Sequence, residues 1–300
     1  MSSILPGTLA LSAQSTTTAA LLAEVAVARG MAVAVLTGPL PDLRGVAAYY
    51  GGPLFGDTVA ASLDVALLEP ADGWLTALPE RWTRRGIAAT TMGEARRLRV
   101  PAFVKPPSDK SFEAAVYTDG TRLPAGVPDA TPVLVAEIRT CVVEYRLFVL
   151  DGVPHTGSRY AIFGRLDPMP LIDDPRAGEV FAFARDLLAE HGAGLPSAVV
   201  LDVGLAGTAD SAEEHWVVVE PNMAWFSNIY AADPARCLDV IVAAAGPRVA
   251  LRPTDTRFTR ARPDTPAHRL NHPHLPAIRC PFAYAPPEAQ ALGVSASAVR

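Results

Sequence analysis

The chain has 300 residues and a mass of 31.6 kDa, which is enough to bury a large hydrophobic core in two or three domains. Half of its residues are hydrophobic, but no apolar run approaches the roughly 20 residues that a membrane-spanning helix needs. The net charge of −5 and the pI near 5.7 argue against a general nucleic-acid surface.

The first part of the chain has the pattern of a small parallel α/β lobe. Residues 9–13 (LALSA) predict a short strand, residues 17–29 predict a helix, and residues 31–37 (MAVAVLT) predict a second strand. The first turn lacks a Gly-rich phosphate fingerprint, so we do not predict a dinucleotide site there. Residues 46–52 (VAAYYGG) and 65–70 (VALLEP) predict further strands.

The next segment leads to a lysine at a strand end. Residues 72–99 carry two helical patterns that are interrupted near Gly86, and they precede a short apolar strand that ends at Lys105. Two prolines stop this strand, and Lys110 follows in a polar loop. A lysine beside a mobile loop is suited to nucleotide phosphates, because its point charge needs no fixed orientation. The same segment holds a basic stretch, which we interpret as a solvated helix face: Arg81, Arg84, Arg85, Arg96, Arg97 and Arg99.

The middle of the chain is mostly sheet and contains the strongest hairpin signal of the sequence, Asp151-Gly152. A two-residue turn there places Glu144 opposite Arg159, so that these two residues and Arg146 share one polar face. Pro154 can introduce a bulge that shifts this register. Two interpretations stay open, namely a surface ion-pair ladder and a charged wall that faces a ligand.

Two later strands each bring an acid to their end. Residues 199–207 (VVLDVGLAG) carry Asp202, and residues 216–222 (WVVVEPN) carry Glu220 and Asn222, which project to the same face of an extended chain. The connection between them allows the two strands to pair as a hairpin. Two carboxylates and an amide oxygen without histidine or cysteine are hard ligands suited to Mg²⁺. Two ordinary strands with exposed acids are the alternative.

The last third begins with a helix at residues 179–191 and a second helix at residues 234–245. From about residue 247 periodicity is lost, so we expect an extended arm or a partly disordered tail. The histidines and the cysteine of this tail match no standard zinc spacing. The segment between Asn222 and the second helix supplies the candidates for substrate contact: Ser227, Asn228 and Tyr230. Core packing is an equal alternative for its aromatic residues.

The order of these pieces resembles the ATP-grasp superfamily. The matching pieces are FVKP, AEI, EYRLFVLDG, VVLDVG and VVVEPN, and they span roughly residues 75–245. More narrowly, the chain resembles the subgroup marked by an E-Y-R strand and two lysines. The phosphate-covering loop of many relatives is Gly-rich, whereas residues 107–113 contain no glycine, so Lys110 is the candidate to replace that loop.

The resemblance implies an α/β ATP-grasp fold with a small N-terminal parallel lobe at residues 1–88, a nucleotide-binding and catalytic region at residues 89–248, and an arm at residues 249–300. It implies a carboxylate–amine ligase that consumes ATP with Mg²⁺ and forms an amide through an acyl phosphate, on an amino acid, peptide or peptide-like metabolite. The implied metal ligands are Asp202, Glu220 and Asn222. Nucleotide contacts are expected from Lys105, Lys110, Ala136, Glu137, Ile138 and Glu144, and catalytic charge from Arg146, Arg159 and Lys110.

Two other classes stay open. A small-molecule kinase would use the same metal site and stop after phosphorylating a hydroxyl, and a non-catalytic nucleotide-binding protein would lack the reaction. The three cysteines form no C-x-x-C pair and the start lacks the basic region of a secretory signal, so we expect a cytoplasmic protein. We expect no membrane or nucleic-acid partner, and a homodimer is an open alternative.

Overall fold

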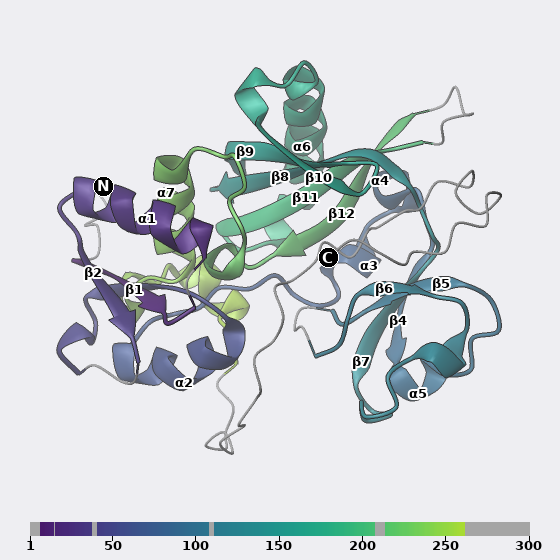
Figure 1. The fold of residues 1–300 in the computed structure, drawn as a ribbon, viewed down its shortest axis with the longest axis horizontal. Helices are drawn as coiled ribbons and strands as arrows, with labels where there is room; N and C mark the ends of the chain where they lie inside the picture. Colours follow the sequence, from purple (N-terminus) through teal and green to yellow (C-terminus); the bar gives the residue numbers. More distant parts are fainter. Residues whose placement is uncertain (1–6, 15, 38–40, 108–110, 208–213, 262–300) are drawn as a thin grey trace, which may run out of the picture.

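The computed structural model describes residues 7–14, 16–37, 41–107, 111–207 and 214–261. These residues form a mixed helix and strand structure with three sheets, whose strand orders are β2-β1-β3, β4-β7-β5-β6 and β10-β9-β8-β11-β12. In Figure 1 the three-stranded sheet lies at the left, the five-stranded sheet in the upper centre and the four-stranded sheet at the lower right. The Lys110 prediction lies outside the described residues, as do the histidines of the tail.

The N-terminal lobe is the predicted parallel α/β unit. Its elements are β1 (Thr8–Ser12), α1 (Thr17–Ala28), β2 (Ala32–Leu36), β3 (Ala47–Tyr50) and α2 (Pro53–Leu63), and β1 pairs in parallel with both other strands. The helices α1 and α2 cover opposite faces of this sheet (Figure 1). The strand predicted at residues 65–70 is wrong. Val65 and Leu68 make only isolated bridges to the C-terminal segment.

The four-stranded sheet replaces part of the predicted helical stretch. After the short helices α3 (Trp74–Ala77) and α4 (Glu80–Thr83), residues 87–91 form a strand, β4, instead of continuing as a helix. The remaining elements of this unit are α5 (Met92–Ala95), β5 (Ala102–Lys105), β6 (Ala115–Tyr117) and β7 (Pro132–Ala136). Pairing with β7 decides the conformation of this segment, IAATT, against the predicted helix.

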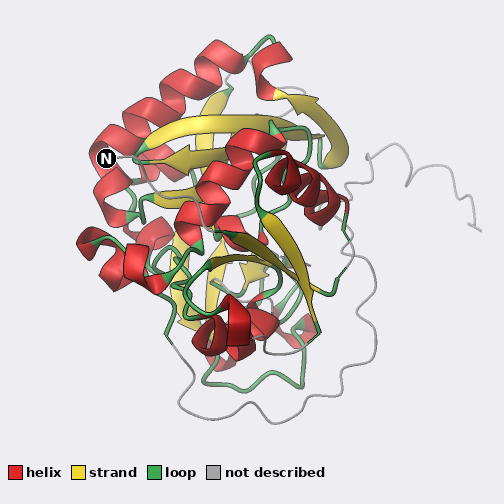
Figure 2. Ribbon diagram, turned by 90° about the vertical axis from the view of Figure 1, so that its left-hand side faces the viewer, coloured by secondary structure: helices red, strands yellow, loops and turns green. Residues whose placement is uncertain are grey.

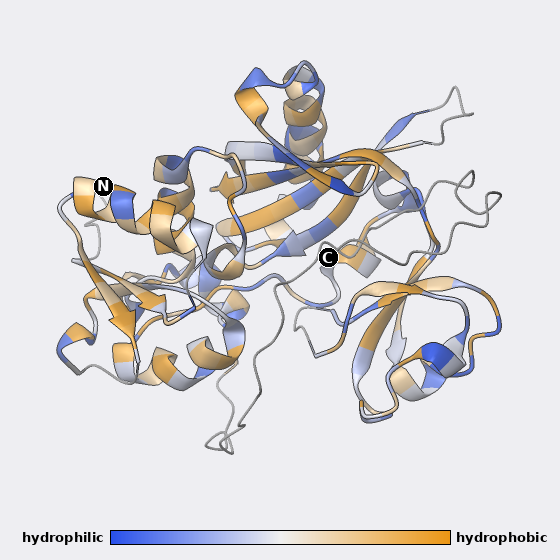
Figure 3. Ribbon diagram, in the orientation of Figure 1, coloured by the Kyte–Doolittle hydropathy of each residue, from blue (hydrophilic) through white to orange (hydrophobic). Residues whose placement is uncertain are grey.

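The five-stranded sheet is antiparallel throughout and carries a helix on each side. Its strands are β8 (Cys141–Leu150), β9 (Val153–Ile162), β10 (Arg165–Pro170), β11 (Ala198–Ala206) and β12 (His215–Asn222). One face packs against α6 (Ala177–His191), and the other faces α7 (Pro234–Ala244) and the N-terminal lobe (Figures 1 and 2). Figure 3 shows apolar residues concentrated along β8 and β11 in the middle of this sheet.

The predicted hairpin is confirmed, but the predicted register is wrong. Asp151 and Gly152 have positive φ values of 52° and 75°, as a type I′ turn requires. A register shift between Phe148 and Val149 in the β8–β9 pair then places Arg159 opposite Tyr145 rather than opposite Glu144. Because opposite residues share a face, Arg159 and Arg146 lie on opposite sides of the sheet.

The start of the expected C-terminal arm is packed against the protein. Residues 247–261 form short turns and bridge back to the N-terminal lobe. The Asp255 carboxylate accepts hydrogen bonds from the backbone N–H of Ser197 at 2.9 Å and from its hydroxyl at 2.6 Å. Arg260 forms ion pairs with Asp57 and with Glu69. An extended arm is therefore wrong for residues 249–261, and the prediction for residues 262–300 lies outside the described part.

The N-terminal lobe shares its hydrophobic core with the five-stranded sheet. The same cluster of buried residues contains Leu9 and Leu22 of the lobe, Phe148 of β8 and Ile241 of α7. The expected division between residues 88 and 89 falls inside β4. Within the described ranges, every helix is too short or too polar to cross a lipid bilayer. The remaining short 3₁₀ turns are η1 (Pro41–Leu43), η2 (Gly120–Arg122), η3 (Leu171–Asp173), η4 (Gly192–Gly194), η5 (Ala224–Phe226), η6 (Arg248–Ala250) and η7 (Pro253–Phe258).

Candidate functional site

Three charged residues form a row across neighbouring strands of the five-stranded sheet. Arg146 of β8 pairs in register with Asp202 of β11, which in turn pairs with Glu220 of β12, so all three side chains lie on one face. We call this face the site face. The Arg146 guanidinium donates two hydrogen bonds to the Asp202 carboxylate, at 2.8 Å and 2.7 Å, in the bidentate geometry that arginine favours. Asp202 is only 1% exposed.

A lysine from the four-stranded sheet extends the row. Lys105 ends β5 and forms an ion pair with Glu220, so this contact joins the four-stranded sheet to the five-stranded sheet. Asn222 completes the group, because its amide nitrogen donates to Asp202 and to Glu220 at 3.1 Å each. The structure therefore brings together the two carboxylates and the amide that the sequence predicts as metal ligands, with a cation paired to each carboxylate.

Burial and the neighbouring charges shift the pKa values of the two carboxylates in this group. Burial raises the pKa of Glu220, but the Lys105 ammonium and the Asn222 amide lower it more, to about 2. Burial raises the pKa of Asp202, and the Arg146 charge opposes that rise. Glu220 is therefore held ionised near neutral pH, as a ligand of a hard cation must be.

A buried carboxyl and two tyrosines flank the row. The hydroxyl of Tyr160 donates to the Glu144 carboxylate at 2.7 Å, and the Tyr160 ring stacks on Tyr230 with centroids 5.2 Å apart. The Arg146 guanidinium carbon lies 5.7 Å and 5.3 Å from the centres of these two rings. Burial and the neighbouring carboxylates raise the pKa of Glu144 to about 7, against the effect of the Tyr160 hydrogen bond.

The segment after β12 connects the site to the N-terminal lobe. The Asn228 side-chain oxygen accepts from the Thr18 hydroxyl at 2.7 Å and from the Tyr230 N–H at 3.0 Å, and the Asn228 carbonyl accepts from Arg146 at 3.4 Å. Ser227 is buried, and its hydroxyl donates to the Met223 carbonyl at 2.7 Å. Asn228 and Tyr230 thus border the row, whereas the Ser227 hydroxyl is used within its own loop.

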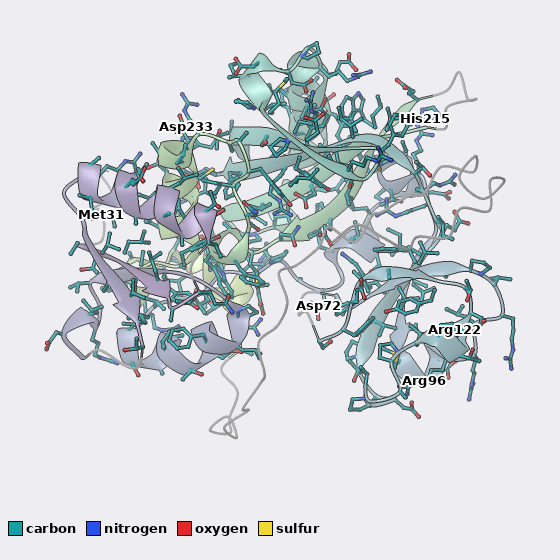
Figure 4. The ribbon with its side chains drawn as sticks, in the orientation of Figure 1. Met31, Asp72, Arg96, Arg122, His215 and Asp233 are labelled. Atoms are coloured by element: carbon teal, nitrogen blue, oxygen red, sulfur yellow. The ribbon has the colours of Figure 1, made fainter. Side chains whose placement is uncertain are left out.

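The expected adenine segment lies where the chain passes between the two larger sheets. Ala136 is the buried last residue of β7, and Ile138 is 45% exposed. The Glu137 carboxylate accepts from the Gly86 N–H at 3.2 Å, and the Glu137 N–H donates back to the Gly86 carbonyl at 3.1 Å. These bonds tie together the two chain segments that connect the four-stranded sheet to the rest. Asp72 (Figure 4) lies nearer to the row of charged residues, because it lines a small pocket together with Lys105 and Pro221.

Comparison with known proteins decides the family. Residues 82–240, more than half of the chain, match the family described as ATP-grasp domain, R-2-K clade, family 2. The chain belongs to this family. Its ATP-grasp domain, a fold that binds ATP, therefore contains every member of the row described above. No protein in the curated set matches the sequence.

Solved structures with a similar arrangement of the chain include the following three. An ATP-grasp RimK domain protein from Sphaerobacter thermophilus DSM 20745 is 17% identical, with a TM-score of 0.47 over 78% of this chain and 99% of that chain. D-alanine–D-alanine ligase from Bacillus anthracis is 14% identical, with a TM-score of 0.49 over 79% and 96%. Macrocyclase MdnC from Microcystis aeruginosa MRC, bound with precursor peptide MdnA, is 13% identical, with a TM-score of 0.43 over 78% and 98%. Since these TM-scores are below 0.5, the family assignment rests on the sequence match.

Two arginines of the ATP-grasp domain differ from their predicted places. Arg159 forms ion pairs with Asp174 and Asp167 on the face opposite to the row. Arg85, expected on a solvated helix face, instead lies in the turn before β4 and donates to backbone carbonyls of β12. Tyr160 is a site residue that the sequence does not predict. Its place two strands away from Asp202 depends on the β8–β9 register, which the sequence leaves open.

The raised pKa of Glu144 predicts that Glu144→Gln stabilises the ATP-grasp domain at alkaline pH. Because the folded-state pKa is about 7 and the ordinary value is 4.5, the folded protein holds this proton more tightly than the unfolded chain. The wild type should lose stability as pH rises from 4.5 to 7, by up to roughly 3 kcal/mol. Glu144→Gln should abolish this loss in metal-free melts at pH 5 and pH 8.

The exposed Glu24 of α1 provides the matched control. Glu24→Gln should follow the wild-type pH dependence. A Glu144→Gln variant that loses stability between pH 5 and pH 8 as steeply as the wild type would contradict the raised pKa.

Proposed function

We propose that this chain is an ADP-forming ligase that joins a carboxylate to an amine, on an amino acid, a peptide or a peptide-like metabolite. The observation that carries the proposal is the convergence of Asp202, Glu220 and Asn222 on the site face, next to Lys105 and Arg146. Two ligand carboxylates and two cations supply the opposite charges that phosphoryl transfer needs, without an enzyme nucleophile.

The donor set fits Mg²⁺. Among the described residues no three His, Cys, Asp or Glu side chains are placed so that they could hold a metal ion together, so the candidate set is two carboxylates and one amide. All three are oxygen donors, and hard cations such as Mg²⁺ prefer oxygen. Asp202, Glu220 and Asn222 would hold the ion, which when bound would neutralise charge on the transferred phosphoryl group.

The cations of the row have a second task. Lys105 and Arg146 neutralise the two carboxylates. If a bound metal took over this neutralisation, each cation would be free to donate to oxygens of the nucleotide phosphates or of the acyl phosphate. Lys105 is fixed by β5, so we assign it to the nucleotide phosphates, and we assign Arg146 to the acyl phosphate. Lys110, which precedes β6, is the further candidate for the phosphates.

The reaction needs positioning rather than covalent catalysis. A substrate carboxylate oxygen attacks the γ-phosphorus of ATP, the bond to the bridging oxygen breaks, and ADP leaves. The amine then attacks the acyl carbon, phosphate leaves, and the amine nitrogen gives up a proton. Glu144, whose pKa is about 7, is our candidate to receive that proton, and Tyr160 and Tyr230 form an aromatic wall beside it.

Product analysis tests the proposed reaction. The purified protein is incubated with ATP, Mg²⁺ and mixtures of amino acids and peptides, ADP release is measured, and the products are identified by mass spectrometry. A ligase consumes a carboxylate and an amine for each ADP and forms an amide. A phosphorylated hydroxyl compound as the final product would instead identify a kinase, and ADP release without any organic product would contradict both.

Nucleotide binding should depend on Mg²⁺ and should stabilise the fold. A ligand present at 100 times its dissociation constant adds about 2.7 kcal/mol to the free energy of unfolding. For a chain of this size we expect the melting temperature to rise by roughly 5–10 °C with a non-hydrolysable ATP analogue and Mg²⁺. An equal rise in melting temperature with the analogue and EDTA would show that nucleotide binding does not depend on Mg²⁺ and would contradict the proposed metal site. No rise at millimolar analogue with correctly folded protein would contradict nucleotide binding.

A further inference from the structure

A β-bulge sets the direction of two of the candidate metal ligands. In the β11–β12 pair, Val203 is opposite Val218 and Asp202 is opposite Glu220, so Val219 has no partner across the pair. Without this extra residue, the register from Val218 onward would place Glu220 opposite Leu201. Leu201 packs in the core on the other side of the sheet. The carboxylate of Glu220 would then point away from Asp202, and Asn222 would turn with it.

Arg85 holds the backbone at this bulge. Its guanidinium donates to the Val218 carbonyl at 3.1 Å and to the Val219 carbonyl at 2.9 Å. In a regular strand successive carbonyls point to opposite sides, so one planar group can donate to both only where the strand is bent. Within the described part of the chain, no carboxylate forms an ion pair with Arg85. Its charge and its donors are therefore directed at the backbone of β12.

Arg85 is itself held in place. The hydroxyl of Thr83 donates to the Arg85 carbonyl at 3.0 Å, and the next residue, Gly86, exchanges two hydrogen bonds with Glu137. The helix that precedes it, α4, lies against β12. The guanidinium thus reaches the bulge from the junction of the two larger sheets.

We propose that Arg85 is a positioning residue of the metal site, because its two hydrogen bonds maintain the bulge that turns Glu220 and Asn222 toward Asp202. This inference rests on the proposed function, since it assumes that these residues bind the metal of the nucleotide. Residues that orient metal ligands from outside typically change metal affinity by 10- to 100-fold when they are replaced.

The test compares the affinity for a non-hydrolysable ATP analogue at saturating Mg²⁺ with the affinity in EDTA. The ratio of the two affinities measures the metal-dependent part of binding and needs no turnover. We expect this ratio to fall at least 10-fold in Arg85→Ala. Arg81 is a matched control, because it lies four residues earlier and forms an exposed surface ion pair with Glu190. Arg81→Ala should keep the wild-type ratio.

Chemical rescue separates positioning from general destabilisation. Ethylguanidinium added to Arg85→Ala should restore the ratio, whereas it should not change the ratio of Arg81→Ala. Arg85→Lys keeps the charge and the aliphatic stem, so it serves in place of Arg85→Ala if the latter does not fold, and its ratio should also fall because an ammonium lacks the planar fork.

Two results would overturn the inference. A wild-type ratio in Arg85→Lys, or in folded Arg85→Ala, overturns it and leaves the proposed function standing. If the melting temperature of that variant is lowered as well, Arg85 is only structural. A ratio of about 1 in the wild-type protein would overturn the proposed metal site and this inference together.

Discussion

Glu220→Gln should lower ADP release on the substrates found by product analysis by on the order of 10² or more, because metal charge stabilisation is worth several kcal/mol. It should also remove most of the Mg²⁺ dependence of nucleotide binding. The shape of the side chain is kept, so the loss is due to the charge of Glu220. The measurements are steady-state ADP release and analogue affinity, both well below the melting temperature of the variant.

The same substitution has a cost in stability that must be separated from its effect on metal binding. The pKa of Glu220 is about 2 in the folded protein against an ordinary 4.5, so its ionised form stabilises the fold above pH 4.5 and that contribution disappears as pH falls toward 2. The contribution is at most about 3 kcal/mol, and it is smaller in practice because the side chain is 30% exposed.

A double variant provides the separation. Glu220→Gln leaves the Lys105 ammonium, which is 8% exposed, without its counter-charge. Adding Lys105→Met should restore stability, while nucleotide binding stays independent of Mg²⁺. If Glu220→Gln instead kept an Mg²⁺ dependence within threefold of the wild type, Glu220 would be an ion-pair partner of Lys105 and not a metal ligand.

Arg146→Met should destabilise the ligand-free protein by about 3–5 kcal/mol, which corresponds to a fall of about 10 °C in melting temperature. The reason is that Asp202, at 1% exposure, would keep its buried charge without the bidentate partner. Thermal and urea unfolding without metal or nucleotide are the measurements.

The pair between Arg252 and Asp151 is a matched control. It joins an arginine to an aspartate at an edge of the same sheet, but the two side chains are 49% and 54% exposed. Arg252→Met should therefore cost less than about 1 kcal/mol. Adding Asp202→Asn to Arg146→Met should recover much of the lost stability, because the unpaired charge is removed. Equal effects of Arg146→Met and Arg252→Met would contradict a buried, desolvated pair.

The parts of the fold that sequence reasoning predicted are those with a strong local pattern. The helix at Thr17–Ala28, the turn at Asp151 and the strands that carry Asp202 and Glu220 all have clear periodicity or turn residues. The pairing of the last two strands also follows from their short connection. The order of the motifs therefore predicted the family. In the structure the three predicted metal ligands lie together.

The parts that were missed depend on contacts between segments far apart in the chain. Arg159 lies on the other face because one bulge in the β8–β9 pair, between the turn and Arg159, changes the register, and alternation alone cannot place a bulge. Arg85 looks like one more residue of a basic stretch until its carbonyl partners, 133 and 134 residues away, are known. Residues 249–261 lack periodicity because their turns are held by the surface they contact.

The packing of residues 247–261 on the N-terminal lobe has a consequence for synthesis on the ribosome. The lobe is made first, but its core includes α7, and Arg260 reaches Asp57 across 203 residues of sequence. At about 5–20 residues per second, the ribosome supplies that arginine roughly 10–40 s after the aspartate. During this interval β1 and β3 have apolar surface that the emerged chain cannot yet cover, so the nascent lobe should be a substrate for chaperones until translation is nearly complete.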